Sequence, residues 1–306
     1  MPGQILRTRK LTKKYGTFSA VDDLSFSIQK GDIYGLVGQN GAGKTTLMKM
    51  IGGMTVPTSG KLELFGQTSE RGLSRARLRI GCMIETPGFF PYLSATENLE
   101  YYRIQKGISE AKRIREVLHF VGLADTGRKK YRDFSMGMKQ RLGLALAIMG
   151  SPDLIILDEP INGLDPMGIA EFRDIIWKLN RECKTTVLLS SHILVELSQI
   201  ATVYGFINRG RLVEQISAKE LTEKCKRRLV IKVNDSEEAA RIIRDELSCT
   251  QYEIKDSRIF VDQYIDTPEV LTDTLVKNGI HVSELTTTGL NLEQYFIHLV
   301  GGNKNA

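Results

Sequence analysis

The sequence contains no long hydrophobic run, and this absence limits where the protein can work. No apolar stretch among its 306 residues approaches the roughly 18 residues that a membrane-spanning helix requires. The first residues are basic and polar, and they lack the apolar core of a secretory signal peptide. We therefore expect a protein that stays in the cytosol.

Cysteines are few, and they lie far from one another in the sequence. None belongs to a C-x-x-C pair, and the four are Cys82, Cys183, Cys225 and Cys249. This distribution predicts isolated, reduced thiols rather than a disulfide framework or a zinc site.

The charge balance is only mildly basic, since 42 lysines and arginines against 36 acidic residues leave a net charge of +6. A small positive excess suits nucleic acid as well as an anionic membrane surface, and it does not decide between them. A hydrophobic content of 42% and a length of 306 residues are typical of a soluble protein with one large and one small domain.

A glycine-rich loop at residues 38–46 fits the pattern G-x-x-x-x-G-K-[ST] at every fixed position. A predicted strand, 33–37, precedes it, and apolar residues at helical spacing follow it in 47–51. Glycines let backbone N–H groups surround an anion, and the start of a helix adds partial positive charge. The predicted binding residues for a nucleoside triphosphate are Gly38, Gln39, Asn40, Gly41, Ala42, Gly43, Lys44, Thr45 and Thr46.

Two side chains of this loop have distinct chemical tasks. Lys44 can reach the β- and γ-phosphates, and the hydroxyl of Thr45 can ligate Mg²⁺. A purely structural alternative is a tight strand-to-helix turn in which the lysine has no binding role. The complete motif between a strand and a helix favours nucleotide binding over such a turn.

An acidic pair follows a second predicted strand. Residues 154–157 are a continuous apolar run, typical of a parallel strand that is buried on both faces, and Asp158 and Glu159 come directly after it. Ligands bind at the carboxyl ends of such strands, so Asp158 can hold Mg²⁺. Glu159 can take a proton from water that attacks the γ-phosphate. His192 follows another strand at the same edge. A lone histidine is usually structural, but this position favours a contact with the γ-phosphate.

Two further residues have two interpretations each. Tyr15 lies in a turn and could stack on an adenine ring or serve only as a packing residue. Ser135 precedes a predicted helix, 136–149, where it is either an N-cap or part of an anion site at the helix N-terminus. The residues alone leave both questions open.

Alternating strands and helices predict a mostly parallel α/β layer over residues 1–215. Two antiparallel strands are expected within 4–30. A helical subdomain over about 86–150 is inserted between two strands of the sheet, and Ser94 with Glu97 forms a capping box at one of its helices.

The pattern restarts at residue 216, after a second predicted capping box formed by Ser217 and Glu220. The order of elements expected in 216–306 resembles a split βαββαβ, ferredoxin-like unit with an added helix at 291–299. This accessory α+β domain carries no motif with evident chemistry. Its basic run, 224–228, is either a solvated face or a contact with a partner or a membrane.

Taken together, the motifs resemble the nucleotide-binding subunit of ATP-binding cassette (ABC) transporters over residues 4 to about 215. The glycine-rich loop matches the Walker A motif of that family, and the acidic pair matches Walker B. Tyr15 matches the adenine-stacking aromatic residue, 134–140 the signature motif, Asp165 the D-loop and His192 the switch histidine. The resemblance implies the ABC form of the α/β P-loop NTPase fold, with a mixed sheet core, an antiparallel β subdomain and the inserted helical subdomain.

The resemblance also implies that two subunits complete each site. The subunits pair head to tail, and each ATP lies between the phosphate loop of one and the signature helix of the other. Ser135, Met136, Gly137 and Met138 would therefore act in trans on the γ-phosphate. Met136 and Met138 depart from the family pattern, because glycine and glutamine are commonest at these positions.

Glu85 is a second departure, since the family usually has glutamine at this position of the Q-loop. That segment links Mg²⁺ to the transmembrane partner, so the resemblance implies a carboxylate near the metal beside Thr45 and Asp158. Glu85 together with the signature at 134–142 looks like the bacitracin- and lantibiotic-resistance exporters. The segment 292–296 resembles the tail of such ATPases.

We therefore predict an ATPase that uses ATP and Mg²⁺, forms a homodimer and drives separate transmembrane permease subunits at the inner face of the cell membrane. The permease would select the peptide antibiotic, and no nucleic acid is expected as a partner. A GTPase is a weaker hypothesis, because the sequence has no N-K-x-D segment for guanine. The subunit could instead serve another export cargo, act as a soluble ABC-type ATPase on ribosomes or DNA, or belong to an importer, against which Glu85 argues mildly.

Overall fold

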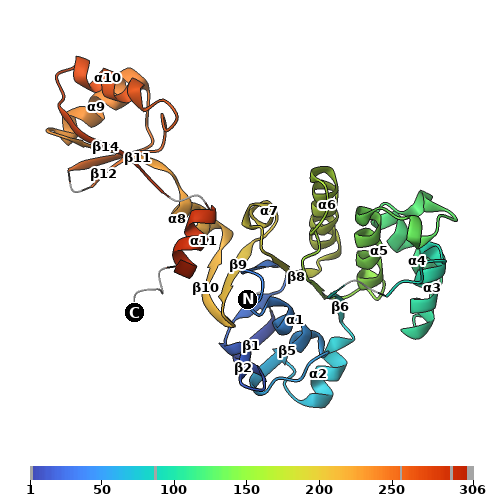
Figure 1. Ribbon diagram of the computed structural model, residues 1–306. Helices are drawn as coiled ribbons and strands as arrows, with labels where there is room; N and C mark the ends of the chain where they lie inside the picture. Colours follow the sequence, from blue (N-terminus) through green and yellow to red (C-terminus); the bar gives the residue numbers. More distant parts are fainter. Residues whose placement is uncertain (1–2, 86–87, 256, 290–291, 302–306) are drawn as a thin grey trace. The chain divides into compact units, whose positions relative to one another are not determined.

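The computed structural model describes residues 3–85, 88–255, 257–289 and 292–301. The chain forms two compact units, Met1–Ala218 and Lys219–Ala306 (Figure 1). None of the helices in the described residues is long and apolar enough to cross a membrane. The nucleotide-site motifs of the sequence all lie in the first unit.

A six-stranded sheet forms the centre of the first unit. All its neighbouring strands run parallel except the first two in spatial order, so the sheet is mixed, as predicted. Strands β4 (Ile33–Val37), β7 (Leu154–Leu157) and β8 (Thr186–Ser191) are buried along their whole length, as strands covered on both faces should be. In spatial order the strands are β10 (Arg211–Ser217), β9 (Val203–Asn208), β4 (Ile33–Val37), β8 (Thr186–Ser191), β7 (Leu154–Leu157) and β6 (Ile80–Met83).

An antiparallel sheet forms a second layer. The expectation of two strands within 4–30 is wrong in detail, because the second run is divided into two strands. At the division, Lys10 N–H donates to Ser25 Oγ (2.8 Å). Phe26 N–H donates to Thr8 Oγ1 (3.1 Å), so side-chain hydroxyls replace ladder bonds between strands. The strands are β1 (Gln4–Tyr15), β2 (Phe18–Leu24), β3 (Ser27–Gln29) and β5 (Ser59–Leu64).

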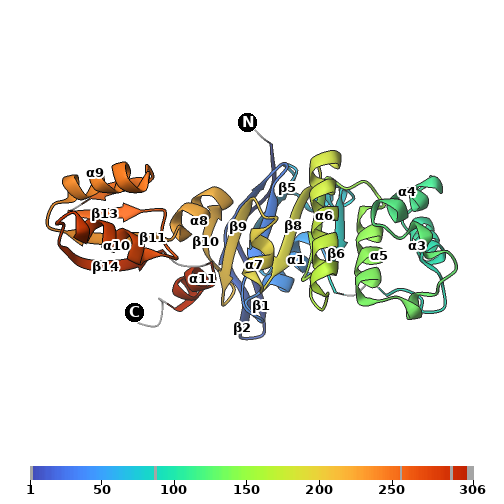
Figure 2. The ribbon, with the colours of Figure 1, turned by 90° about the horizontal axis from the view of Figure 1, so that it is seen from above.

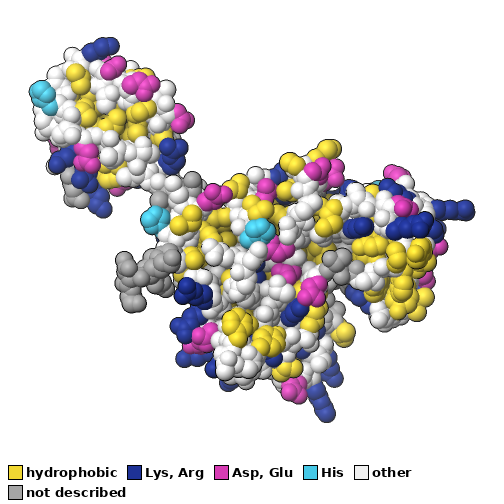
Figure 3. Space-filling view, viewed as in Figure 1, with side chains coloured by type: hydrophobic (Ala, Val, Ile, Leu, Met, Phe, Trp, Pro, Cys, Tyr) yellow, Lys and Arg dark blue, Asp and Glu magenta, His cyan; other side chains and the backbone are white. Residues whose placement is uncertain are grey.

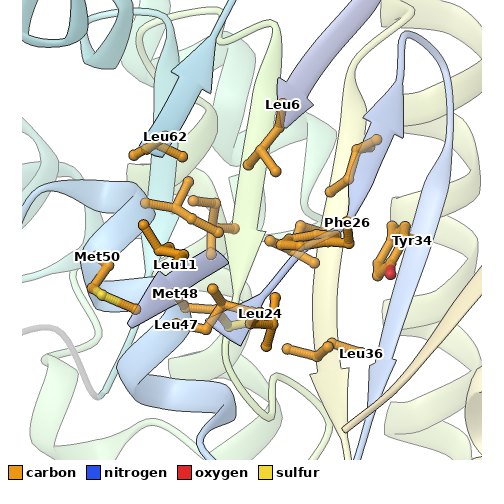
Figure 4. Packing of buried hydrophobic residues seen from close by; sticks show 14 of the residues in the cluster. Leu6, Leu11, Leu24, Phe26, Tyr34, Leu36, Leu47, Met48, Met50 and Leu62 are labelled. Atoms are coloured by element: carbon orange, nitrogen blue, oxygen red, sulfur yellow. The ribbon is translucent and has the colours of Figure 1, made fainter. Parts of the chain in front are cut away.

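Helix α1 (Lys44–Gly52) packs into the core that the two sheets share. Its Leu47 and Met48 are fully buried in one cluster with Leu6 of the antiparallel sheet and with Tyr34 and Leu36 of the central sheet (Figure 4). Each such side chain contributes roughly 1.5–3 kcal/mol through burial, so α1 and the loop that precedes it are firmly held. Helices α6 (Pro166–Cys183) and α7 (Leu194–Ser198) lie on the other face of the central sheet (Figure 1).

The inserted helical subdomain lies between β6 and β7 in the sequence and extends beyond the β6 edge of the sheet (Figure 2). It contains α3 (Ala95–Gln105), α4 (Lys112–Phe120), α5 (Met136–Ile148) and the short 3₁₀ turns Ala124–Thr126 and Tyr131–Asp133. Its expected start at about residue 86 falls on Thr86 and Pro87, which lie outside the described residues. Helix α2 (Glu70–Arg77) precedes β6.

The capping box predicted for α3 is confirmed. Ser94 Oγ accepts a hydrogen bond from Glu97 N–H (3.3 Å), and Ser94 N–H donates to Glu97 Oε2 (2.6 Å). These bonds to Ser94, with a further one from Lys130, lower the pKa of Glu97 to about 2. The charged carboxylate therefore stabilises the start of the helix.

The second unit contains a four-stranded antiparallel sheet in the order β12–β13–β11–β14. The core of this unit lies between the sheet and two helices, α9 (Ser236–Leu247) and α10 (Pro268–Lys277). Ile231, Ile243 and Leu275 are fully buried there. The helix expected at 291–299 is described from Leu292, because residue 291 lies outside the described residues. The elements are α8 (Ala218–Cys225), β11 (Arg228–Val233), α9 (Ser236–Leu247), β12 (Tyr252–Lys255), β13 (Arg258–Val261), α10 (Pro268–Lys277), β14 (Val282–Thr288) and α11 (Leu292–Gly301).

Candidate nucleotide-binding site

Three parallel strands bring the predicted site residues to one edge of the central sheet. Val37 is opposite Ser191, and Leu157 is opposite Leu189, so β4, β7 and β8 end together. The phosphate loop follows β4, the acidic pair follows β7 and His192 follows β8. Ligands of α/β sheets bind at this carboxyl edge.

The phosphate loop needs glycine where it meets its neighbours. Gly43 is the N-cap of α1 and has a φ of 106°, which side chains other than glycine rarely adopt. A Cβ atom at Gly43 would also overlap the carbonyl oxygen of Ala20, and one at Gly38 would lie 2.7 Å from that of Ile207. The loop therefore forms a fixed backbone cradle at the N-terminus of a helix, which suits phosphate.

Lys44 lies beneath this cradle with only 5% of its surface exposed. Its Nζ donates to the carbonyl oxygens of Gly38 (2.7 Å) and Gln39 (3.3 Å). The same ammonium lies 3.1 Å from Glu159 Oε1 as an ion pair. Because the lysine contacts both the loop carbonyls and Glu159, its charge is held where phosphates would enter.

Thr45, Asp158 and Ser190 form a chain of short hydrogen bonds. Thr45 Oγ1 donates to Asp158 Oδ2, and Ser190 Oγ donates to Asp158 Oδ1, each over 2.6 Å. Both carboxylate oxygens are therefore oriented by a hydroxyl group. Thr45 and Asp158 are site residues predicted from the sequence, whereas no sequence pattern predicts a role for Ser190.

Glu159 stands between Lys44 and His192. Its Oε2 lies 2.7 Å from His192 Nδ1. Its Oε1 is buried and, among the described residues, has no hydrogen-bond partner, although the ion pair to Lys44 is close. The backbone of Glu159 is left-handed, with a φ of 48°. One carboxylate oxygen thus contacts His192 and the other faces Lys44.

Glu85 lies against α1 and is largely exposed. Its Oε1 accepts a hydrogen bond from Lys49 Nζ over 2.5 Å, and this bond raises the pKa of Lys49. Lys49 is a site residue that sequence reasoning missed, although it lies one helical turn after Thr45 and therefore on the same face of α1.

Tyr15 ends β1 with 51% of its surface exposed, and the ammonium of Lys13 lies 5.0 Å from the centre of its ring. Gln39, Asn40 and Gly41 are likewise exposed. The exposed tyrosine ring is accessible for a stacking contact.

The signature residues lie apart from the phosphate loop, on α5 of the helical subdomain (Figure 2). Ser135 is the N-cap of α5, and its Oγ accepts from Met138 N–H over 3.3 Å. Ser135, Met136 and Gly137 line one surface hollow with Asp165, which caps α6 through Gly168 N–H (3.0 Å). In the described part of the chain, no hydrogen bond or ion pair joins these residues to the phosphate loop.

A protein cage for a metal is absent from the described residues, since no three His, Cys, Asp or Glu side chains are grouped to hold one. Mg²⁺ does not require such a cage, because it commonly takes one or two carboxylates, substrate phosphates and water. The hydroxyl of Thr45 beside the carboxylate of Asp158, next to the phosphate cradle, fits that donor set.

The fold and this site define a P-loop ATPase of the ABC type. Residues 21–162 match the ABC transporter family. The bacitracin transport ATP-binding protein BcrA of Enterococcus faecalis is 40% identical over 299 residues, which cover 97% of each chain. The lantibiotic transport ATP-binding protein SrtF of Streptococcus pyogenes is 42% identical over 68% of this chain and 89% of its own. The solved structure of an ATP binding subunit of an ABC transporter has a TM-score of 0.63 and 27% identity, covering 72% of this chain and 92% of that one.

The chain belongs to the family of ABC transporter ATP-binding subunits, which hydrolyse ATP to power transport. This finding confirms the family, the fold class and the ATPase activity predicted from the sequence. The match to BcrA covers 97% of the chain and therefore includes the second unit.

Proposed function

We propose that this subunit powers a separate membrane permease that exports peptide antibiotics of the bacitracin or lantibiotic type. The observation that carries the proposal is the 40% identity to a bacitracin transport ATP-binding protein over 97% of both chains. The likeness extends through the second unit, beyond the machinery needed for ATP hydrolysis. Glu85 and the signature at 134–142 support the same subgroup.

ATP would bind with its phosphates on the backbone N–H groups of the loop and on Lys44, and with its adenine on Tyr15. Thr45 and Asp158 would hold Mg²⁺, which neutralises charge on the phosphates. Glu85 would join this group through Oε2, since its Oε1 is bound to Lys49.

Glu159 would act as the general base. Its Oε2 is held by His192 at 2.7 Å, while Oε1 faces Lys44 at 3.1 Å. An entering γ-phosphate carries more charge than a carboxylate and competes for Lys44. Once Lys44 turns to the phosphate, Oε1 would be free to accept a proton from the attacking water, and His192 would contact the γ-phosphate.

A second copy of the chain would complete each site. Ser135 and the N-terminus of α5 offer N–H groups for an anion, yet among the described residues no hydrogen bond or ion pair joins them to the phosphate loop of their own chain. A head-to-tail homodimer places Ser135 of one copy, with Asp165 near it, against the ATP of the other.

The permease would dock on the helical subdomain. Hydrophobic side chains gather over the region of α3 and α4 (Figure 3). Phe90, Tyr92 and Tyr101 are 40%, 70% and 47% exposed, and they follow Glu85 in the sequence. An aromatic patch of this kind is typical of a protein interface. Through it the subunit would be held at the inner face of the cell membrane.

A deletion strain complemented with variants tests the proposal. The minimal inhibitory concentrations of bacitracin, of a lantibiotic and of a ribosome-directed antibiotic are measured in parallel. We expect the deletion to lower resistance to one of the two peptides only. The wild-type chain should restore resistance, whereas Glu159→Gln should not.

Unchanged resistance to both peptides would refute the assigned cargo. Purification from solubilised membranes checks the partner, because a permease subunit should accompany the wild-type chain. Recovery with ribosomes or nucleic acid instead would favour the soluble ABC-type ATPase.

A further inference from the structure

Ser190 is a fully buried serine near the carboxyl end of β8. It lies two residues before His192, and its hydroxyl group touches the two acidic residues of the site at once. The adjacent Ser191 does not share these contacts, because its hydroxyl bonds the backbone of Ile193.

The hydrogen bonds of Ser190 have a defined direction. A carboxylate only accepts, so the single hydroxyl proton goes to Asp158 Oδ1 (2.6 Å). The oxygen of the same hydroxyl accepts from Glu159 N–H (2.9 Å). Because Thr45 donates to the other oxygen of Asp158, both edges of that carboxylate are fixed.

The second bond restrains an unfavourable backbone conformation. Glu159 has a φ of 48°, in the left-handed region that is unfavourable for a residue other than glycine. Without Ser190, the N–H of Glu159 would lose its partner in a part-buried site. The peptide that carries the carboxylate could then rotate, and Oε1 would move away from the loop.

We infer that Ser190 is a positioning residue that fixes the metal-site carboxylate and the general base relative to each other through one hydroxyl group. The inference rests on the roles proposed above for Asp158 and Glu159. It predicts that the hydroxyl matters for turnover and for metal dependence, and that it has little effect on the binding of nucleotide without metal.

The matched pair Ser190→Thr and Ser190→Val tests this role, since the two side chains have nearly the same shape and only threonine keeps the hydroxyl. Ser190→Ala adds a smaller variant should valine not fit. Thr186→Val is the control, because it removes a buried hydroxyl from the amino end of the same strand, where its partner is Gly31 N–H.

For the full-length protein, kcat, the Mg²⁺ concentration at half-maximal rate and the affinity for ATP in EDTA are measured, together with the melting temperature. We expect Ser190→Val and Ser190→Ala to lower kcat about tenfold, as for the loss of one site hydrogen bond. Both should raise the Mg²⁺ requirement severalfold and bind metal-free ATP within about twofold of wild type. Ser190→Thr should recover most of the rate, and Thr186→Val should keep the wild-type Mg²⁺ requirement.

If Ser190→Thr and Ser190→Val lose the same fraction of kcat, the inference is overturned, because side-chain volume rather than the hydroxyl would then be the cause. Wild-type kcat in Ser190→Ala would overturn it as well. The kcat values of Glu159→Gln and Asp158→Asn are measured in the same series. They distinguish a failure of the positioning role of Ser190 from a failure of the proposed mechanism. If these two variants are inactive while Ser190→Ala is normal, only the positioning role is wrong. If Glu159→Gln hydrolyses ATP normally, the general-base assignment is wrong.

Discussion

Gly43 offers the sharpest test of the phosphate cradle. Its φ of 106° would cost alanine about 1–2 kcal/mol in backbone strain. The added Cβ would come closer to the carbonyl oxygen of Ala20 than real Cβ contacts allow, and relieving this overlap costs a further 1–3 kcal/mol or so. We therefore expect Gly43→Ala to destabilise the first unit by about 2–5 kcal/mol.

Gly43→Ala should also weaken the affinity for ATP, because the loop cannot keep the backbone conformation that binds phosphate. Loss of two N–H bonds to phosphate, at about 1.4 kcal/mol each, corresponds to a weakening of about 100-fold. Substitutions of two other glycines distinguish the effect of backbone strain from the effect of Cβ overlap. Gly16→Ala has positive φ but free space and should cost about 1–2 kcal/mol, and Gly150→Ala has neither problem and should be neutral within about 0.5 kcal/mol.

The assay uses the single tryptophan of the chain, Trp177, which lies in α6 and therefore reports on the first unit. Urea unfolding followed by its fluorescence gives the change in stability, provided that the slope with urea stays constant. Nucleotide titration gives the affinity. If Gly43→Ala binds ATP within threefold of wild type and unfolds at the urea concentration of Gly150→Ala, the argument from backbone overlap is refuted.

Three further variants test the site and the helix cap. Glu159→Gln should abolish steady-state hydrolysis yet keep ATP binding and lengthen the lifetime of the dimer, as measured by size exclusion with ATP; turnover at the normal rate would contradict a general base. Because Glu85 raises the pKa of Lys49 in the folded state, their pair stabilises fully below the unfolded pKa of about 10.5 and is lost as pH rises through the folded value. The difference in melting temperature between wild type and Glu85→Gln should therefore shrink at strongly alkaline pH, and a constant difference would refute the pair. The pKa of Glu97 is lowered to about 2, so its contribution is present above about pH 4.5 and is lost as pH falls toward 2. Glu97→Gln should melt below wild type at pH 6 and together with it near pH 2, whereas equal melting at pH 6 would show that the capping box contributes nothing.

Local patterns sufficed for much of the fold and for the family. The run of 33–37, the loop of 38–46 and the run of 154–157 have the lengths, glycines and apolar residues that define a strand, a phosphate loop and a buried strand. The structure has β4 and β7 at the predicted bounds, and α1 begins at Lys44, within the last residues of the loop motif. The capping box of Ser94 and Glu97 is likewise a property of adjacent residues.

Contacts between residues far apart in the sequence could not be predicted from local sequence patterns. No local pattern gives Ser190 a role, because only the parallel pairing of β7 and β8 brings it to Asp158 and Glu159. The ion pair of Lys49 with Glu85 joins α1 to the segment after β6, and no spacing rule relates the two.

The sequence by itself thus determined the strand, the glycine-rich loop and the start of the helix, and it predicted which residues bind a nucleoside triphosphate, because glycine conformation, helix spacing and strand length act over a few neighbours. Only the tertiary structure decided how Lys44, Glu159 and His192 meet and which hydroxyl bonds both the Asp158 carboxylate and the backbone N–H of Glu159. Those contacts depend on the order of strands in the sheet, which many distant residues set together through the burial of a common core.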